Sequence, residues 1–358
     1  MRFLNDLNLL TLKTSIEVCK GTFIISSTLV ALHLLMKKTV AIVFGGYSSE
    51  WIISELSASV VFKHLDKSKY DSYLVKISKE SWDVILSDGS KSPINRNDFS
   101  FMEKGSARTF DVVFNAIHGT PGEDGKLQGY WDMLNIPYTS PGVLASSLTF
   151  SKSYCNGFLR QFGDVNIAAS VMVRKGDKVD AKAILDKVGL PCFVKPNNLG
   201  SSFGITKLKD ASKFDEALAT ALENDTEAVI EQFIKGDEIA SGVYQHNTTV
   251  IALPLTEIVS KNEYFDYQAK YEGASEEITP ARIPDSVRDL IQETTRRVFT
   301  RLKLKGMSRI DYIVQDDVPY LIEVNTIPGL SEASLLPQQV VYSGITLQDF
   351  FGQLIEGA

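Results

Sequence analysis

Four polar residues near the C-terminus have the types and spacing for phosphate chemistry. Arg309 and Asp311 lie two apart, as do Glu323 and Asn325, and the stretch between the pairs has the pattern of a strand, a polar turn and a strand. A hairpin centred near Asp317 would place Asp311 opposite Glu323 and Arg309 opposite Asn325, all on one face. Two carboxylates and an amide there suit Mg²⁺, and the arginine could neutralise a phosphate or an oxyanion. The alternative is a surface hairpin with a salt bridge.

The residues around this hairpin extend the interpretation. The opposite face would carry apolar side chains, namely Ile310, Tyr312, Ile322 and Val324. The segment after Asn325 could aim the Gly329 N–H at the region that Arg309 faces, and Ser334 could bind a carboxylate nearby.

Two glycine-rich loops must be positioned by an earlier domain, which we expect over residues 36–145. An apolar run at 39–44 leads through Gly45-Gly46 to Glu50 and a helix at 53–65, and a second run at 111–117 leads into the loop 118–125. Alternating strands and helices predict a parallel sheet with ligands at its carboxyl ends. His118 and Glu123 would hold a polar small molecule there, although a turn-rich loop is the simpler reading.

A third loop, Gly200–Gly204, lies between predicted strands at 193–196 and 205–208 in a segment that we place at 146–232, before a last domain at 233–358. Its glycines could cradle a phosphate, but the Lys-Ser/Thr ending of a Walker A loop is missing, and a plain hairpin loop is the alternative. Lys195 adds positive charge just upstream. Lys152 is a second candidate cation, unless it is simply solvated.

Composition limits the function classes. The chain has 358 residues, 44% hydrophobic and 23% charged, with a net charge of −7, which predicts two or three globular domains and disfavours nucleic-acid binding. Three widely spaced cysteines give no disulfide framework and fit a reducing compartment. Residues 1–35 carry an apolar run at 23–35 that is short for a membrane helix. A secretory signal, an anchor and translated upstream sequence compete, and we favour the last, with Met36 as the start.

Six ordered strings together resemble the D-alanine–D-alanine ligase family of the ATP-grasp superfamily, over nearly all of Met36–Ala358. They are Phe44–Glu50, His118–Gly125, Lys195–Gly204, Asp266–Tyr271, Arg309–Asp311 and Glu323–Gly329. The resemblance implies an α/β, ATP-grasp fold of three domains: an N-terminal Rossmann-like parallel-sheet domain, a central α+β domain and a C-terminal α+β domain. ATP would lie between the last two.

The resemblance also implies a reaction. The carboxylate of a first D-alanine would attack the γ-phosphate of ATP, and the amine of a second would attack the resulting acyl phosphate, giving D-alanyl-D-alanine for peptidoglycan synthesis. Two Mg²⁺ (or Mn²⁺) would be held by Asp311, Glu323 and Asn325. Its partners would be D-alanine and ATP, with no nucleic acid or membrane, and homodimers are usual in the family.

Residue roles are likewise carried over. Glu50 would hold the first ammonium, His118 would lie near the first carboxylate, and Ser201 would orient Glu50 and a loop tyrosine. Arg309 and the Gly329 N–H would face the oxyanion, and Ser334 the second carboxylate. The remaining roles are Lys152 and Lys195 on ATP phosphates, Glu231 and Glu238 on adenine and ribose, and Lys270 and Tyr271 on a closing loop.

Alternatives and departures remain. Tyr271 goes with D-alanine rather than D-lactate as acceptor, so Tyr271→Phe should raise ester formation. Another ATP-grasp carboxylate–amine ligase, a nicotinamide oxidoreductase without the full GxGxxG, and an inactive nucleotide-binding protein are alternatives. The chain departs from the family pattern at Trp51-Ile52-Ile53, Gln232 and Phe265.

Overall fold

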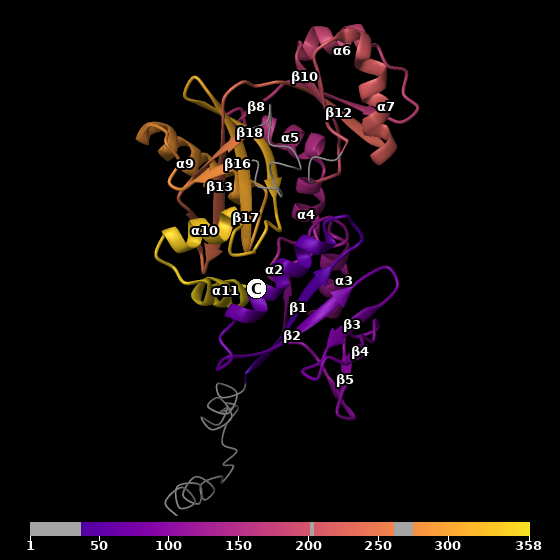
Figure 1. Cartoon of the computed structure of the whole chain (residues 1–358), viewed down its shortest axis with the longest axis vertical. Helices are drawn as coiled ribbons and strands as arrows, with labels where there is room; N and C mark the ends of the chain where they lie inside the picture. Colours follow the sequence, from indigo (N-terminus) through magenta and orange to yellow (C-terminus); the bar gives the residue numbers. More distant parts are fainter. Residues whose placement is uncertain (1–36, 201–203, 261–274) are drawn as a thin grey trace, which may run out of the picture. The chain divides into compact units, whose positions relative to one another are not determined.

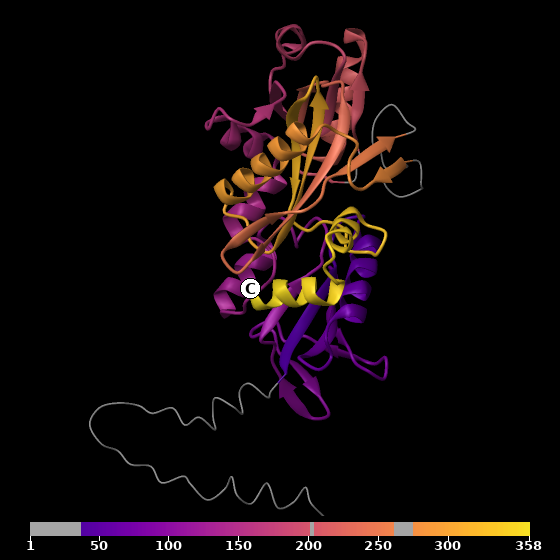
Figure 2. The same ribbon diagram turned by 90° about the vertical axis from the view of Figure 1, so that its left-hand side faces the viewer.

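The structure is a computed structural model that describes residues 37–200, 204–260 and 275–358. Lys38–Ala358 form one compact unit built on three main sheets (Figures 1 and 2). A small hairpin of β5 (Phe101–Glu103) and β6 (Ser106–Arg108) is separate from them. The predictions about residues 1–35 lie outside the described residues.

The N-terminal sheet is parallel only in part. Its order is β4-β3-β2-β1-β7, made by β1 (Lys38–Gly45), β2 (Tyr70–Ile77), β3 (Trp82–Ile85), β4 (Lys91–Pro93) and β7 (Val112–Asn115). β2, β1 and β7 run parallel, as predicted, whereas β3 and β4 are antiparallel. The reason is the tight turn between Ser78 and Ser81, because a parallel pairing needs a long crossover.

The helix α2 (Trp51–His64) packs on this sheet through small polar residues. Its buried side chains are Ser54, Ser57, Ala58 and Val61. Ser54 Oγ accepts from Gly45 N and donates to Ala116 O, so the helix is tied to the ends of β1 and β7. The loop 118–125 and α3 (Lys126–Leu134) complete this part.

The central sheet is antiparallel, in the order β11-β10-β12-β9, with β9 (Ser170–Arg174), β10 (Cys192–Pro196), β11 (Thr206–Leu208) and β12 (Glu227–Gln232). Helices α6 (Ala181–Val188) and α7 (Phe214–Asn224), the latter preceded by a 3₁₀ turn η1 (Ala211–Lys213), share its hydrophobic core. By contrast, α4 (Val143–Phe150) and α5 (Lys152–Arg160) pack with the C-terminal core through Ala145, Cys155 and Leu159. The predicted domain boundaries stay predictions.

The C-terminal sheet has the order β16-β15-β13-β17-β18-β8, with β14 paired to β13. Its strands are β8 (Asn166–Ile167), β13 (Asp237–His246), β14 (Thr249–Ala252), β15 (Thr256–Ser260), β16 (Ser275–Ile278), β17 (Met307–Gln315) and β18 (Val318–Asn325). Helix α9 (Asp285–Arg301) packs on it.

The last two helices connect the C-terminal sheet to the N-terminal one. α10 (Leu335–Tyr342) and α11 (Leu347–Glu356) place Leu336, Phe350 and Phe351 in one core cluster with Ile42 and Phe114 of β1 and β7. Both views show α11 beside the N-terminal strands. Among the described residues, no helix combines the length and apolar character needed to span a bilayer.

Candidate active site

The hairpin β17–β18 pairs the four polar residues as predicted. Asp311 lies opposite Glu323, and Arg309 lies opposite Asn325. The turn differs from the one predicted, which was centred near Asp317. It consists of Asp316 and Asp317, both with positive φ, and the pairing register shifts beside Asp311. Positive φ at both positions is the signature of a two-residue type I′ turn, and the bulge then supplies the one-residue offset that a loop centred on Asp317 would have given.

The bulge corrects one prediction. Ile322 was expected among the apolar side chains behind the hairpin, but the core there takes Leu321 with Ile310 and Tyr312. Ile322 is partly buried and lines the pocket in front, next to Glu323. An extra residue in one strand reverses the facing of the side chains beyond it.

Asp311 is the best-held acid of the hairpin. Arg309 donates from Nε and from its second terminal nitrogen to the two carboxylate oxygens, both at 2.8 Å, and Asn325 Nδ2 donates to Oδ2 at 2.9 Å. The salt bridge that was the simpler alternative is therefore present, but it is largely buried rather than on the surface. A carboxylate has about four acceptor positions, so these three hydrogen bonds leave about one position for a metal.

The donor set suits Mg²⁺ rather than a metal held by protein alone. Within 37–200, 204–260 and 275–358, no group of three or more His, Cys, Asp or Glu side chains is placed to hold a metal ion. Asp311, Glu323 and the amide oxygen of Asn325 could supply part of an oxygen shell, and Mg²⁺ commonly completes such a shell with phosphate and water oxygens. The residues present fit that ion.

A cavity of about 370 Å³ opens in front of the hairpin. It gathers most of the predicted side chains, namely Glu50, His118, Lys152, Arg309, Glu323, Asn325, Gly329 and Ser334. These come from both glycine-rich ends of the N-terminal sheet, from α5, and from the C-terminal hairpin. The structure therefore brings these distant segments together, and the roles predicted for their residues stay predictions.

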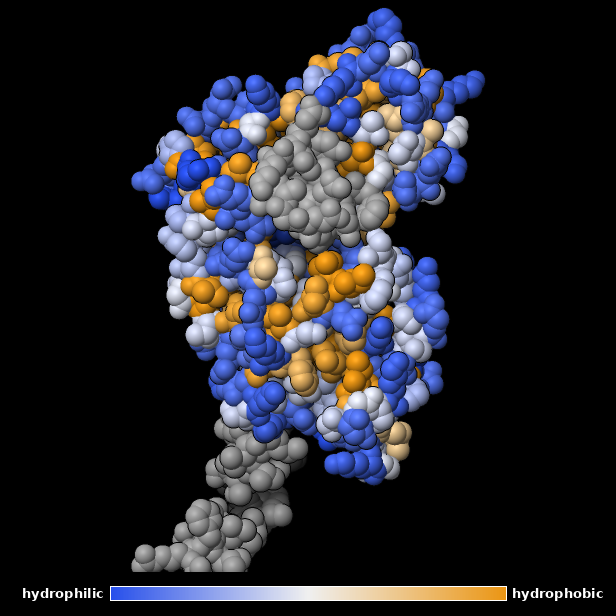
Figure 3. Space-filling model, in the orientation of Figure 1, coloured by the Kyte–Doolittle hydropathy of each residue, from blue (hydrophilic) through white to orange (hydrophobic). Residues whose placement is uncertain are grey.

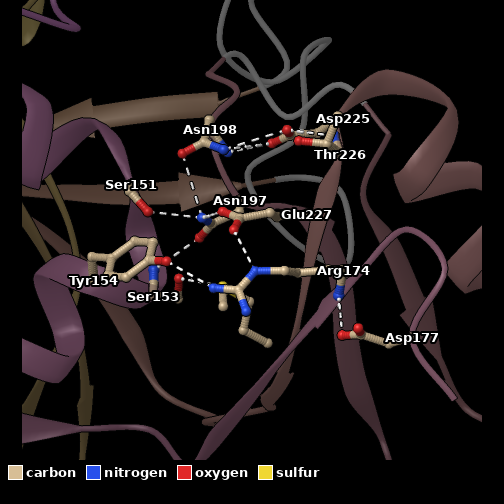
Figure 4. A network of polar contacts seen from close by, with 11 residues as sticks. Ser151, Ser153, Tyr154, Arg174, Asp177, Asn197, Asn198, Asp225, Thr226 and Glu227 are labelled. Carbon is tan, nitrogen blue, oxygen red and sulfur yellow. Dashed lines mark hydrogen bonds and ion pairs between the residues drawn. The ribbon is translucent and has the colours of Figure 1, made fainter. Parts of the chain in front are cut away.

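Lys152 reaches the hairpin from the first residue of α5. Its Nζ lies 3.6 Å from Glu323 Oε2 and donates to Leu199 O at 2.8 Å. Asn197 holds the helix end, because its Oδ1 accepts from Ser153 N while its Nδ2 donates to Ser151 Oγ and Glu227 Oε2 (Figure 4). The beginning of α5 is thus capped by a residue distant in sequence, and this cap fixes the position of the Lys152 backbone.

Glu50 lies between two glycine loops. A Cβ on Gly200 would come within 3.1 Å of both its carboxylate oxygens, and one on Gly119 within 3.2 Å of Oε2. These backbones approach the acid closely because they lack side chains. Glu50 is therefore placed to hold a cationic group at the meeting point of both loops.

The loop 118–125 clamps the segment that follows the hairpin. His118 Nδ1 donates to Ile327 O at 2.7 Å, and Ile327 N donates to Glu123 Oε1 at 2.9 Å, so the peptide groups of one residue are held at both ends. Glu123 Oε2 also accepts from Gly119 N. Ile327 lies two residues before Gly329, so this clamp helps to fix the Gly329 N–H.

The electrostatics of the clamp follow from its burial. Burial lowers the pKa of His118 below its ordinary value, which favours the neutral ring. With Nδ1–H on the carbonyl, Nε2 accepts from Ser57 Oγ, which itself accepts from Leu330 N. Burial, followed by the charge of Glu50, raises the pKa of Glu123 to about 7, against the two backbone donors. His118 is thus a structural tie as well as a pocket residue.

Gly329 and Ser334 meet at the start of α10. A Cβ on Gly329 would lie 2.8 Å from Ser334 Oγ. Ser334 is the N-cap, yet its hydroxyl bonds Ser331 Oγ rather than the helix backbone. The N–H groups of the first turn therefore face the cavity end without a side-chain cap, an arrangement that favours a carboxylate.

Three predicted ATP-binding residues do not line this cavity. Lys195 Nζ donates to Glu231 Oε1 at 2.6 Å, with both side chains buried between β10 and β12. Glu238 is partly buried on β13. Their roles toward ATP stay predictions, as do those of Ser201, Lys270 and Tyr271, which lie outside the described residues.

Sequence reasoning missed several pocket features. Glu277 of β16 and Asn156 of α5 line the cavity, and the Nδ2 atom of Asn156 is buried without a hydrogen-bond partner. For Glu277, the available sequence signal is the pair of adjacent acids Glu276 and Glu277 in a short strand, because neighbouring residues of a strand face opposite sides and one of the two must face inward. Cys155 also lines the cavity, but burial raises its thiol pKa to about 12, which makes a thiolate nucleophile unfavourable.

The departure at Trp51-Ile52-Ile53 has a structural counterpart. Trp51, Ile52 and Leu56 are 43%, 53% and 52% exposed, because small residues take the buried face of α2. In the orientation of Figure 1, the space-filling view of Figure 3 shows apolar side chains gathered across the region of α2. Ile53 and Leu56 line the cavity mouth.

Comparisons with known proteins agree with this geometry. Residues 39–141 match the family described as D-ala D-ala ligase N-terminus, and residues 158–356 match D-ala D-ala ligase C-terminus. A D-alanine–D-alanine ligase from Flavobacterium johnsoniae is 47% identical over 319 residues, covering 89% of this chain and 98% of the relative. One from Parabacteroides distasonis is 47% identical over 322 residues, covering 90% and 97%.

Solved structures share the fold. A VanG D-Ala:D-Ser ligase from Enterococcus faecalis has a TM-score of 0.78 at 29% identity, covering 90% of this chain and 99% of that one. The Bacillus anthracis D-alanine–D-alanine ligase complexed with ATP has a TM-score of 0.73 at 28% identity, covering 89% and 97%. The chain has the ATP-grasp fold of these neighbours, and it belongs to the D-alanine–D-alanine ligase family.

Proposed function

We propose that this protein joins two D-alanines to D-alanyl-D-alanine, converting ATP to ADP and phosphate through a D-alanyl phosphate intermediate. Family membership supports the reaction. The single structural observation that carries it is the cavity that brings Glu50, Lys152 and Gly329 in front of Glu323 and Asn325 of the hairpin, with Asp311 buried behind the cavity wall. A carboxylate activated by phosphate and a nucleophilic amine would meet there.

The first half-reaction needs charge neutralisation and positioning more than covalent help. Glu50 would hold the ammonium of the first D-alanine, which leaves its carboxylate to face the ATP phosphate. Lys152 would contact the phosphates from the α5 end. Asp311, Glu323 and Asn325 would hold Mg²⁺ or Mn²⁺, which when bound supplies positive charge to the phosphate oxygens.

The Lys195–Glu231 pair has a more specific implication. If Lys195 turned away from Glu231 to bind phosphate, it would leave a buried carboxylate that it now contacts at 2.6 Å, and breaking one side of such a pair is costly. Glu231 would then need a new donor, and the adenine amino group is one. The two predicted roles are therefore linked, since one ATP molecule would replace both halves of the ion pair.

The second half-reaction develops negative charge on the attacked carbonyl oxygen. Arg309 and the Gly329 N–H would stabilise that oxyanion, with the Ile327 clamp holding the glycine in place. Ser334 and the first turn of α10 would take the carboxylate of the second D-alanine. The amine of that substrate, once its ammonium form has lost a proton to water, would attack the carbonyl carbon, and the bond from that carbon to the phosphate oxygen would break.

A coupled assay of ADP release tests the reaction. With ATP and Mg²⁺, release should depend strictly on D-alanine, and the dipeptide should appear in equal amount. ADP release without D-alanine, or release driven by L-amino acids, would contradict the proposal. Replacing Mg²⁺ by Mn²⁺ should retain turnover, whereas chelation should abolish it.

The cellular setting follows from the product. D-Alanyl-D-alanine would feed peptidoglycan precursor synthesis in the cytoplasm, without a nucleic-acid or membrane partner. The family resemblance further suggests a homodimer. Fractionation of cells and the mass of the purified protein in solution would test these two points.

A further inference from the structure

Glu277 stands in the cavity wall although no motif marks it. It lies on β16, directly opposite Ile258 of β15. Directly opposite residues share a sheet face, and Ile258 packs in a small cluster with Leu335, the first residue of α10. Glu277 therefore lies on the face of the sheet that meets the beginning of α10.

A hydrogen bond fixes this placement. Gln338 Nε2 donates to Glu277 Oε2 at 3.1 Å and to Ala333 O at 2.7 Å. Gln338 is one helical turn beyond Ser334, so the carboxylate is held beside the first turn of α10. That turn is where the proposed function puts the carboxylate of the second D-alanine.

The amine of that substrate is attached to the same carbon as its carboxylate. It must therefore lie within a few bonds of the α10 end, where its positive charge needs a partner. Among residues 37–200, 204–260 and 275–358, the acids that line the cavity are Glu50, Glu123, Glu277 and Glu323. Glu50 faces the glycine loops, Glu123 accepts two backbone N–H groups, and Glu323 belongs to the hairpin near Lys152. Of these four, Glu277 is the acid beside the beginning of α10.

The environment of Glu277 suits a cationic ligand. Burial raises its pKa, while the Gln338 amide and the charge of Arg309 oppose the rise. A partly buried carboxylate is costly without a cation close by. A substrate ammonium would stabilise its ionised form, and the neutral hydroxyl of an acid such as D-lactate would not.

We propose that Glu277 receives the ammonium group of the second substrate and makes the site prefer an amine acceptor over a hydroxyl acceptor. This inference rests on the proposed function. It assigns a specificity-determining contact to β16, separate from the tyrosine at 271 that the family resemblance suggested. It also gives the two substrates separate acids, Glu50 for the first ammonium and Glu277 for the second.

The test uses Glu277→Gln, which keeps size and removes charge, with Glu276→Gln as the matched control. Glu276 is the neighbouring acid on the same strand, but it is exposed and faces the other way. Each variant is given ATP, D-alanine and D-lactate, and the ratio of dipeptide to ester is measured by mass spectrometry. Separately, hydroxylamine replaces the second substrate and traps the acyl phosphate as a hydroxamate, which needs no ammonium contact.

For Glu277→Gln, we expect the KM of the second D-alanine to rise about 10- to 100-fold, the scale of a hydrogen bond to a charged group. The product ratio should move toward the ester by about tenfold or more, and hydroxamate formation should stay within about twofold. Glu276→Gln should match the wild type. Glu277→Asp, which keeps the charge, should retain more amine preference than Glu277→Gln.

An unchanged product ratio and KM in a folded Glu277→Gln variant would overturn the inference. So would a fall in hydroxamate formation equal to the fall in dipeptide, since that marks a role in the first half-reaction or in structure. Equal preferences in the Asp and Gln variants would also refute it. If the wild type gives neither hydroxamate nor dipeptide, the proposed function itself fails and this inference with it.

Discussion

Replacing Asn197 by aspartate tests the network that fixes Lys152. Asn197 is fully buried, and its Nδ2 donates to Glu227 Oε2 at 2.7 Å while its Oδ1 accepts from Ser153 N at 2.9 Å (Figure 4). Aspartate keeps the acceptor for the helix end but sets a second oxygen against the Glu227 carboxylate. In the wild type the Ser151 hydroxyl accepts from Asn197 Nδ2, and in the variant it could turn and donate to the aspartate oxygen. The Asn198 amide, whose Oδ1 accepts from Asn197 Nδ2 at 3.4 Å, could also turn and donate, so the main conflict is with Glu227.

The magnitude depends on pH. Two charges 2.7 Å apart repel by about 6 kcal/mol at an effective dielectric constant of about 20. The pair can avoid this by keeping one proton, which costs about 4 kcal/mol at pH 7 and about 1.4 kcal/mol at pH 5 for a reference pKa near 4. The folded pKa of the pair is thus raised, so stability is lost as pH rises. Asn197→Asp should lie below the wild type by roughly 4 kcal/mol at pH 7 and roughly 1.4 at pH 5.

Thermal unfolding at both pH values measures this difference. At about 2 °C per kcal/mol for a chain of this size, Tm should fall by roughly 8 °C at pH 7 and roughly 3 °C at pH 5. Asn197→Ala should lose roughly 2–4 kcal/mol at either pH, because it leaves buried partners unpaired without adding charge. Asn198→Asp, at a partly exposed neighbouring position, should show a smaller pH effect. A loss for Asn197→Asp that is the same at both pH values would refute the reasoning.

Three further changes probe the remaining parts of the site. Glu323→Gln should lower kcat for ATP-dependent ligation by roughly 100-fold while Tm persists, and full turnover in a steady-state assay would refute the metal assignment. Gly329→Ala brings a methyl group to 2.8 Å from Ser334 Oγ, so the KM of the second D-alanine should rise with little change in Tm; an unchanged KM would count against that subsite. The lowered pKa of His118 means that its contribution to stability is present above about pH 6.5 and is lost as pH falls. Between pH 8 and pH 5, the free energy of unfolding should therefore fall less for His118→Gln than for the wild type. Equal pH slopes of this free energy in the two proteins would contradict the buried neutral ring.

The sequence was most informative where a pattern repeats along an element. The parallel run of β1 with β7 follows from two continuous apolar runs that each lead into a glycine-rich loop, and the facing of Asp311 and Glu323 follows from the alternation of side chains along a strand. The order of motifs then indicated the family and hence the fold. These features depend on local spacing, which a sequence displays directly.

Other features depend on contacts that leave no local pattern. The bulge that turns Ile322 toward the cavity changes one residue's pairing, and no residue type announces it. α2 buries serines and exposes Trp51 because Ser54 and Ser57 bond distant backbone and His118, which inverts the usual amphipathic signal. Glu277 faces inward only because β16 pairs with β15 in one register. Each is decided by a partner far away in sequence.

The Ile327 peptide shows why these distant contacts matter for the reaction. Its carbonyl accepts from His118 and its N–H donates to Glu123, so a loop of the N-terminal sheet fixes a segment of the C-terminal hairpin. The same loop approaches Glu50, which would hold the first substrate, and the same segment carries Gly329, which would face the oxyanion. A shift of either loop would move both half-reactions together. An acyl phosphate formed beside the N-terminal loops could therefore be attacked by the amine of the second substrate without leaving the cavity. The groups that would stabilise the oxyanion belong to the C-terminal segment that the same loops hold.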